Sequence, residues 1–142
     1  MEIASNPQAT KVDSVPESRL EANKQTVLRF YQIALNNKDF ETASKLIGPR
    51  YVQHNPLIAD GIDGLKGFID CLRETFPRLR MEIKNIFAER DFVIAHVHGV
   101  RVPGQRGSAS VDIFKLEHGK IVEHWAVIQP IPDEAENPNG MF

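Results

Sequence analysis

The sequence predicts an α+β domain, with helices in its first half and an antiparallel sheet in its second half. Apolar residues recur at helical spacing in the first half, for example at Val27, Tyr31 and Ala34. From Leu79 onward, apolar and polar residues alternate as they do in half-buried strands, and the turn motifs RD, PGQ and HG divide this part of the chain. Helices followed by an antiparallel meander are typical of an α+β domain in which the helices cover one sheet face.

Start and stop signals place two helices before residue 50. Ser14 is positioned as an N-cap for the first, with Pro16 in the first turn and Glu17 three residues after the cap. The segment NNKD ends this helix. Asp39 is placed to cap a short second helix, which we expect to stop at the Gly-Pro pair of residues 48–49.

The rest of the chain predicts one short strand, a third helix and four longer strands. The segment RYVQHNP reads as a strand that enters a proline loop. The third helix follows the segment DGIDG, has an apolar stripe that includes Leu65, Ile69 and Leu72, and ends before Pro77. The four strands are expected over residues 79–89, 92–102, 107–117 and 120–131.

Size and charge favour a single cytoplasmic domain. The chain has 142 residues, a formal net charge of −2 and one cysteine, Cys71, which we expect to pack as a small apolar side chain. This charge gives no electrostatic reason to expect nucleic acid or a membrane surface as a partner. No apolar run has the length of a membrane span, and the N-terminus has no secretory signal pattern. We expect a disordered arm over residues 1–14 and one domain over residues 15–142.

The turn between the last two strands decides which residue faces Asp112. A three-residue turn over residues 117–119 pairs Asp112 with His124, whereas a two-residue turn pairs it with Trp125. Histidine fits a two-residue turn poorly, because both central residues then need positive φ. That register also puts Glu123 on the core face as an unpaired charge. We therefore expect the three-residue turn, with Asp112 and His124 as cross-strand neighbours beneath the helices.

The preceding hairpin places polar side chains among apolar ones. With Arg90-Asp91 as a two-residue turn, Asn85 pairs with His96, and Ile83 pairs with His98. Polar side chains within an apolar concavity are typical of a ligand pocket, so Asn85, His96 and His98 are expected to line one. The apolar residues of the same face, which we expect to be the inner one, are Met81, Ile83, Phe87, Phe92 and Ile94.

Three segments carry a family resemblance: RYVQHNPLIADGIDGLKGFI, VIAHVHGV and VDIFKLEHGKIVEHWAVIQPIP. They are similar to the SnoaL-like polyketide cyclases of the nuclear-transport-factor-2-like (NTF2-like) superfamily, and the likeness runs from about Leu20 to the C-terminus. The resemblance implies a cone-shaped α+β barrel, in which three N-terminal helices pack on a curved, mostly antiparallel sheet and enclose a pocket. It also implies a homodimer formed through the outer sheet face.

The resemblance further implies cofactor-free, aldol-type chemistry in which a pocket aspartate acts as general acid and base on an enolisable substrate. Asp112 lies where that aspartate is expected. The chain departs from the family pattern at two positions. Ala126 stands where relatives usually carry an inward aspartate, and His118 stands where they usually carry the aspartate of the turn.

Asp112 and His124 are the best catalytic candidates, with His96 as a third. Burial in an apolar pocket raises the pKa of a carboxylic acid and a protonated histidine lowers it, so such a pair can transfer a proton near neutral pH. One alternative is a buried ion pair that only fixes the strand register. Another is a metal site of two histidines and one carboxylate, but the sequence has no metal-ligand motif beyond His-x-His, and we expect neither metal nor cofactor.

Further residues are expected to bind substrate. His54 is placed at the pocket mouth, where it could polarise a carbonyl or bond the loop backbone, and Tyr31 could hold a substrate oxygen or pack in the core. Arg101 alternates outward, which disfavours the arginine with two aspartates that epoxide hydrolases of this superfamily use. The expected substrate-binding set is His54, Asn55, Tyr31, Asn85, His98, Phe114, Ala126 and Ile128.

We therefore expect a lyase, isomerase or cyclase that acts by acid/base chemistry on a mainly apolar, carbonyl-containing small molecule, in polyketide or terpenoid metabolism. A non-catalytic ligand-binding or dimerising module is the alternative. The expected outer sheet face is apolar enough to predict a homodimer that buries Trp125. Its expected members are Trp125, Val111, Ile113, Ile121 and Val127.

Overall fold

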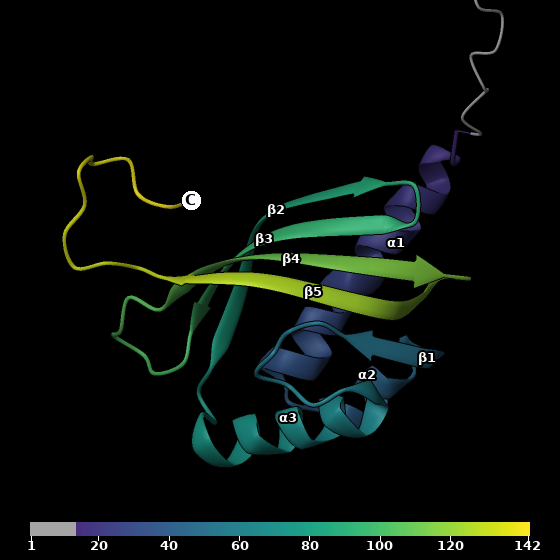
Figure 1. Ribbon diagram of the computed structural model, residues 1–142, viewed down its shortest axis with the longest axis horizontal. Coiled ribbons are helices and arrows are strands. Elements are labelled where there is room, and N and C mark those ends of the chain that lie inside the picture. The colour runs from purple at the N-terminus through teal and green to yellow at the C-terminus, as the bar shows by residue number, and fades with distance from the viewer. Residues whose placement is uncertain (1–13) are drawn as a thin grey trace, which may run out of the picture.

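The computed structural model of the protein describes residues 14–142 (Figure 1). The expected disordered arm lies outside the described residues, apart from Ser14. None of the helices in residues 14–142 combines the length and apolar character that a membrane crossing requires. The elements in chain order are α1 (Glu17–Phe30), η1 (Tyr31–Asn36, a π-helical continuation of α1), α2 (Phe40–Ser44), β1 (Ile47–Gln53), α3 (Gly61–Thr75), β2 (Arg80–Glu89), β3 (Phe92–Val100), β4 (Ser108–Glu117) and β5 (Lys120–Pro130).

The strands form one five-stranded sheet in the order β1-β5-β4-β3-β2. Strands β2 to β5 are an antiparallel meander, and β1 pairs in parallel with β5. Figure 1 shows α1 crossing one face of this sheet, where it packs against β2 and β3, while α3 packs against β1. The α+β class and the NTF2-like arrangement are confirmed, and the curved sheet does not close into a barrel.

Two of the expected helix signals are wrong and one is confirmed. The Asp39 side chain caps α2 by accepting a hydrogen bond from the Thr42 backbone N–H at 3.1 Å. The N-cap of α1 is Pro16 rather than Ser14, and no side chain bonds there. The Gly-Pro pair of residues 48–49 lies inside β1 and does not end α2. A proline is tolerated in β1 because β1 is an edge strand.

The expected three-residue turn between β4 and β5 is wrong. His118 and Gly119 form a two-residue turn, with φ values of 50° and 73°, and Glu117 pairs with Lys120. Beyond Leu116 and Ile121 the register of the two strands shifts by one residue, because Val122 forms a bulge in β5. The cross-strand partner of Asp112 is therefore Ala126, and not His124 or Trp125.

This bulge keeps His124 on the inner face of the sheet. A two-residue turn alone would have placed residue 124 on the opposite face from Asp112, because side chains alternate along a strand. The extra residue reverses that alternation, so His124 pairs with Phe114 and lies diagonally across from Asp112. The two-residue turn itself pairs Ile121 with Leu116 and so puts Ile121 into the core, fully buried, where we expected it on the outer face.

The hairpin of β2 and β3 has the expected turn but the opposite inner face. Asn85 pairs with His96 as expected, whereas a bulge at Lys84 pairs Ile83 with Val97 rather than with His98. The fully buried residues of β3 are Val93, Ala95 and Val97. Phe87, Phe92, Ile94, Asn85, His96 and His98 therefore lie on the outer face. The alternation in the sequence did not identify the inner face, because β3 carries apolar residues on both faces. Met81 and Ile83 do lie on the inner face, because the bulge at Lys84 shifts them there.

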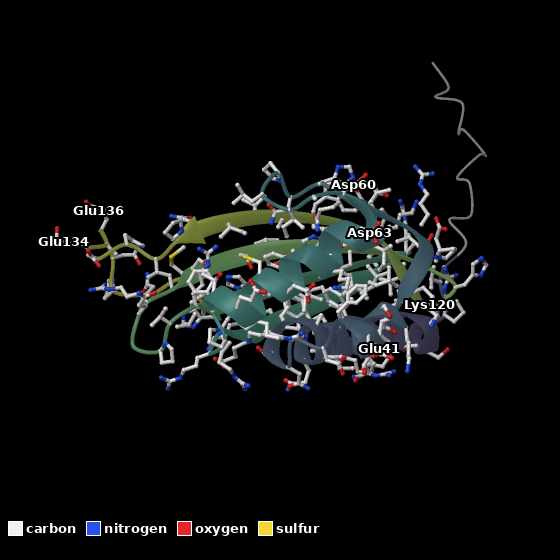
Figure 2. The ribbon with its side chains drawn as sticks, turned by 90° about the horizontal axis from the view of Figure 1, so that it is seen from below. Glu41, Asp60, Asp63, Lys120, Glu134 and Glu136 are labelled. Atoms are coloured by element: carbon white, nitrogen blue, oxygen red, sulfur yellow. The ribbon has the colours of Figure 1, made fainter. Side chains whose placement is uncertain are left out.

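The C-terminal segment returns to the outer face of the sheet. The Phe142 ring lies 5.2 Å from the His96 ring and 4.7 Å from the His98 ring, measured between centroids. Glu134 and Glu136 project from this segment, away from the helices (Figure 2). His96 and His98 are therefore in contact with the chain terminus and not with the interior of the domain.

Candidate active site

A cavity lies between the helices and the inner face of the sheet. Its inner chamber has a volume of about 90 Å³, with walls from η1, β1, β4 and β5. A wider outer chamber of about 270 Å³ adjoins it beneath α3. The two share several lining residues, among them Asn55, Ile58 and Ser110. Aromatic and aliphatic side chains form most of both walls, which is typical of a pocket for a mainly apolar ligand.

A carboxylate and an imidazole meet in the inner chamber. His124 Nε2 lies 2.7 Å from Asp112 Oδ1, and Ser110 Oγ donates a hydrogen bond to Asp112 Oδ2 at 2.7 Å. Asp112 is 7% exposed and His124 is 8% exposed. Both oxygens of the carboxyl group thus have a partner, as a charge this deeply buried requires.

The other ring nitrogen of His124 is held from the neighbouring strand. Gln53 pairs with His124 across β1 and β5, and Gln53 Oε1 lies 2.8 Å from His124 Nδ1. Gln53 Nε2 in turn donates to the Tyr51 hydroxyl at 3.1 Å. The imidazole is therefore fixed at both nitrogens, one by an amide and one by a carboxyl group.

These bonds determine how many protons the pair holds. The Asn55 backbone N–H donates to Gln53 Oε1 at 2.9 Å, which identifies that atom as the amide oxygen. His124 Nδ1 must then donate to it as an N–H. Nε2 either carries a proton and donates to the Asp112 carboxylate, or lacks one and accepts from the protonated carboxyl. Asp112 and His124 therefore share one transferable proton across a 2.7 Å hydrogen bond.

The Tyr31 hydroxyl is buried in the same chamber without a hydrogen-bond partner in the described part of the chain. Burial raises the pKa of Tyr31 well above its usual value, and the nearby Asp112 carboxyl group raises it further. The hydroxyl therefore stays protonated at any ordinary pH and is available as a donor. Leaving a buried hydroxyl unpaired costs about 1–3 kcal/mol, so this group is the natural partner for a ligand oxygen.

The start of α3 is bonded to the strand that carries Gln53. Figure 2 shows Asp60 at this end of the helix. Its Oδ1 accepts a hydrogen bond from the Gln53 backbone N–H at 2.8 Å. Bonds from the backbone N–H groups of Gln53 and Gly61 hold the pKa of Asp60 below its usual value. Asp60 thereby fixes Gln53, and through it His124.

The structure brings only part of the expected site together. Tyr31, Asn55, Phe114 and Ile128 line the inner chamber with Asp112 and His124. Ala126 faces Asp112 across the strands but lines neither chamber. Cys71 is exposed and borders the outer chamber, so it does not pack as a core residue.

Four expected site residues lie outside the cavity. His54 stacks on Trp125 with ring centroids 4.7 Å apart and bonds Glu123 at 2.7 Å. It points away because side chains alternate along β1, so that Gln53 faces inward. Asn85, His96 and His98 are on the outer face, and the metal-ligand set of Asp112, His96 and His124 does not form. Within the described residues, no group of three or more histidine, cysteine, aspartate or glutamate side chains is close enough to hold a metal ion.

Three polar residues of the chamber were not expected: Tyr51, Gln53 and Ser110. A signal for each was present in the sequence. Ser110 is two residues before Asp112 and so shares its face. Tyr51 and Gln53 likewise alternate with His54 in the segment RYVQHNP, so placing His54 outside would have placed both of them inside.

The fold and the site define a small α+β protein of the NTF2-like class, with an acid/base pair inside its cavity. A family profile described as SnoaL-like polyketide cyclase matches residues 25–136, and the chain belongs to this family. Among curated proteins, no sequence matches it.

Solved structures with similar folds come from several bacteria. TsrD from Streptomyces laurentii is 22% identical with a TM-score of 0.63, and the match covers 75% of this chain and 88% of that one. A candidate polyketide cyclase from Bacillus cereus is 19% identical with a TM-score of 0.70, covering 80% and 78%. An NTF2-like protein of unknown function from Cytophaga hutchinsonii is 19% identical with a TM-score of 0.63, covering 76% and 90%. At these identities the likeness shows the fold alone.

Proposed function

We propose that this chain is a cofactor-independent acid/base enzyme that moves a proton at a carbon next to a substrate carbonyl. The observation that carries the proposal is the 2.7 Å contact between Asp112 and His124 within a mainly apolar chamber. A carboxyl group that shares a proton with an imidazole can accept a proton from carbon and return it. The apolar walls fit a mainly apolar substrate, and membership of the SnoaL-like family supports a ring-closing reaction.

Each residue has its own role in the proposed step. Asp112 removes the proton, and the electron pair of the C–H bond moves into an enolate. His124 and Ser110 hold the carboxyl group by one hydrogen bond to each oxygen, and Tyr31 donates to the enolate oxygen. Asp112 then returns the proton, either to the remote carbon of a dienolate, where the substrate carries a C=C next to the carbon that lost the proton, or to the alkoxide that forms when the enolate carbon attacks a second carbonyl. The first outcome migrates a double bond, the second closes a ring, and neither consumes a co-reactant.

Exchange of hydrogen for deuterium tests this proposal without knowledge of the natural substrate. Ketones with acidic benzylic C–H groups, such as 2-tetralone, are incubated with the protein in D₂O, and the loss of the C–H signal is followed by NMR. We expect exchange faster than in buffer at the same pD, in proportion to protein concentration. Binding of these ketones without accelerated exchange would contradict the enzyme and support the non-catalytic binding module.

Replacing Tyr31 by Phe tests whether the Tyr31 hydroxyl contributes to catalysis or to the stability of the fold. Among the described residues the Tyr31 hydroxyl has no hydrogen-bond partner of normal geometry, although it lies near the Asp112 carboxyl group, so we expect the Tyr31→Phe protein to be about as stable as the parent. The rate of exchange should fall about tenfold or more, because the enolate oxygen loses its donor. Urea unfolding and the NMR assay measure the two effects.

The matched control is Tyr51→Phe, which removes a hydroxyl that accepts from Gln53. This change should cost about 0.5–1.5 kcal/mol of stability. A Tyr31→Phe protein that loses stability and keeps its exchange rate would contradict the assigned role.

We also propose that two copies associate through the outer sheet face. Apolar side chains there remain open to solvent, with Phe87 60%, Ile94 39%, Val111 43% and Val127 74% exposed. A contiguous apolar surface of this kind is typical of an interface between subunits.

Val127→Glu tests the association, because a charge in the middle of an apolar interface must be buried without a partner. Sedimentation should find the parent as a dimer at micromolar concentration and the variant as a monomer. Val102→Glu is the control, since Val102 is 44% exposed in the loop after β3 and off the sheet. A monomeric parent, or a Val127→Glu dimer as stable as the parent, would contradict the proposal.

A further inference from the structure

The two chambers of the cavity carry different ionisable groups. In the inner chamber, the lining carboxyl group is that of Asp112, beside His124. In the outer chamber, Arg101 is the one charged residue among the described residues that line it. No aspartate or glutamate of residues 14–142 lines the outer chamber. A ligand that fills both chambers therefore meets the acid/base pair at one end and a cation at the other.

Arg101, which we expected to face outward, lines the outer chamber and stacks on an aromatic ring there. It is the first residue after β3, and its guanidinium carbon lies 5.1 Å from the centre of the Phe76 ring. Stacking on a ring leaves the N–H groups at the edge of the guanidinium plane free to bind an anion. Within residues 14–142, no carboxylate lies within ion-pair distance of Arg101, whereas Arg19 pairs with Asp91 and Arg106 with Asp133.

The pairing of β3 with β4 sets the distance between Asp112 and Arg101. Asp112, Ser110 and Ser108 alternate along the same face of β4, and Ser108 pairs with Gly99, two residues before Arg101. Four residues of strand span about 13 Å, so Ser108 lies about that far from Asp112 along β4. Arg101 lies two residues farther along, and its side chain reaches back toward the cavity, so its binding point lies on the order of 13 Å from Asp112.

We propose that the substrate carries a carboxylate, bound by Arg101 at the outer chamber, at the far end of an apolar body from the carbonyl that faces Asp112. The proposal rests on the acid/base function proposed above and names the class of its substrate: a keto acid. The planar fork of a guanidinium matches the two oxygens of a carboxylate. A phosphate dianion would require more than the single positive charge that this chamber offers.

Paired ligands test this assignment by binding alone. Phenylalkanoic acids with chains of four to ten carbons and their primary amides have the same body and differ in charge, and calorimetry measures both. We expect the acid of best-fitting length to bind about tenfold more tightly than its amide, as a charge-assisted hydrogen bond predicts. In the Arg101→Gln protein the acid and the amide should bind within about twofold of each other.

Two further variants test whether the preference for the acid depends on Arg101 and not on other charged residues. Arg78→Gln removes the same charge from an exposed arginine that lines neither chamber, so it should keep the preference for the acid. Asp112→Asn should keep it too, which separates this proposal from the acid/base function. If no acid of the series binds the parent more tightly than its amide, the proposal is overturned, whether or not the amides bind. If the preference for the acid remains in the Arg101→Gln protein and increases in the Asp112→Asn protein, the carboxylate binds at the inner end of the cavity, and the proposal is likewise overturned.

Discussion

The Asp112→Asn protein is expected to turn over its substrate about 10²–10⁴-fold more slowly than the parent, while its fold and its affinity for substrate change little. An amide has nearly the shape of a carboxyl group but cannot accept a proton from carbon. The fold should survive because neutral His124, with its proton on Nδ1, can accept a hydrogen bond from the new amide at the 2.7 Å contact now made by Asp112. Thermal unfolding and steady-state kinetics measure the two effects.

The control for Asp112→Asn is Asp63→Asn, the same chemical change at an exposed residue in the first turn of α3. This variant should match the parent in rate. The alternative, in which the buried pair only fixes the register, predicts the opposite result: the Asp112→Asn protein would lose stability and have no activity to lose. An Asp112→Asn protein as active as the parent would exclude the proposed role.

The His124→Gln variant examines whether the pair acts as a unit. Alone, it should slow turnover by removing the group that shares the proton with Asp112. Combined with Asp112→Asn, it should add little further loss, because the first change has already removed the proton transfer. Fully additive losses would mean that the two residues act in separate steps.

The Phe114→Ala protein is expected to lose about 3–5 kcal/mol of unfolding free energy. Phe114 is 1% exposed, and its ring lies 5.9 Å from the Phe30 ring and 5.8 Å from the Tyr31 ring, both edge to face. Removing it leaves a cavity under α1 that the sheet cannot fill, because neighbouring backbone is fixed by the strand ladder on both sides.

Urea unfolding measures this loss, and Leu57→Ala provides the control. Leu57 is 83% exposed, so its truncation should cost less than about 0.5 kcal/mol. A Phe114→Ala loss below about 1 kcal/mol would mean that the core relaxes around the missing ring. The inner chamber would then be a less rigid support for Asp112 and His124 than the structure indicates.

The sequence by itself determined the class of the fold, because the change from helical spacing to alternation at Leu79 requires no knowledge of contacts. The ends of the long strands followed from their turn residues, and the structure places them within two residues of the expected positions. Asp112 was identifiable as a polar residue on a face shared with Phe114 and Leu116, both 1% exposed.

The tertiary structure decided which residues meet Asp112. A two-residue turn alone would put His124 on the opposite face from Asp112, and the bulge at Val122 shifts it back to the same face. The alternation of residues in the sequence does not reveal this extra residue. His96 lies outside because β3 and β4 pair Ala95, and not His96, with Asp112. A second bulge, at Lys84, puts Met81 and Ile83 on the inner face. A bulge shifts a strand by one residue, and since the side-chain period is two, one residue exchanges the two faces.

The parallel pairing of β1 with β5 also depends on the tertiary structure. It brings Gln53 beside His124 from a segment 71 residues away in sequence. Local patterns give the direction of each side chain along its own strand, but pairing between distant strands depends on how the helices close over the sheet. The residues that orient the proton-transferring pair are therefore visible only once the chain has folded.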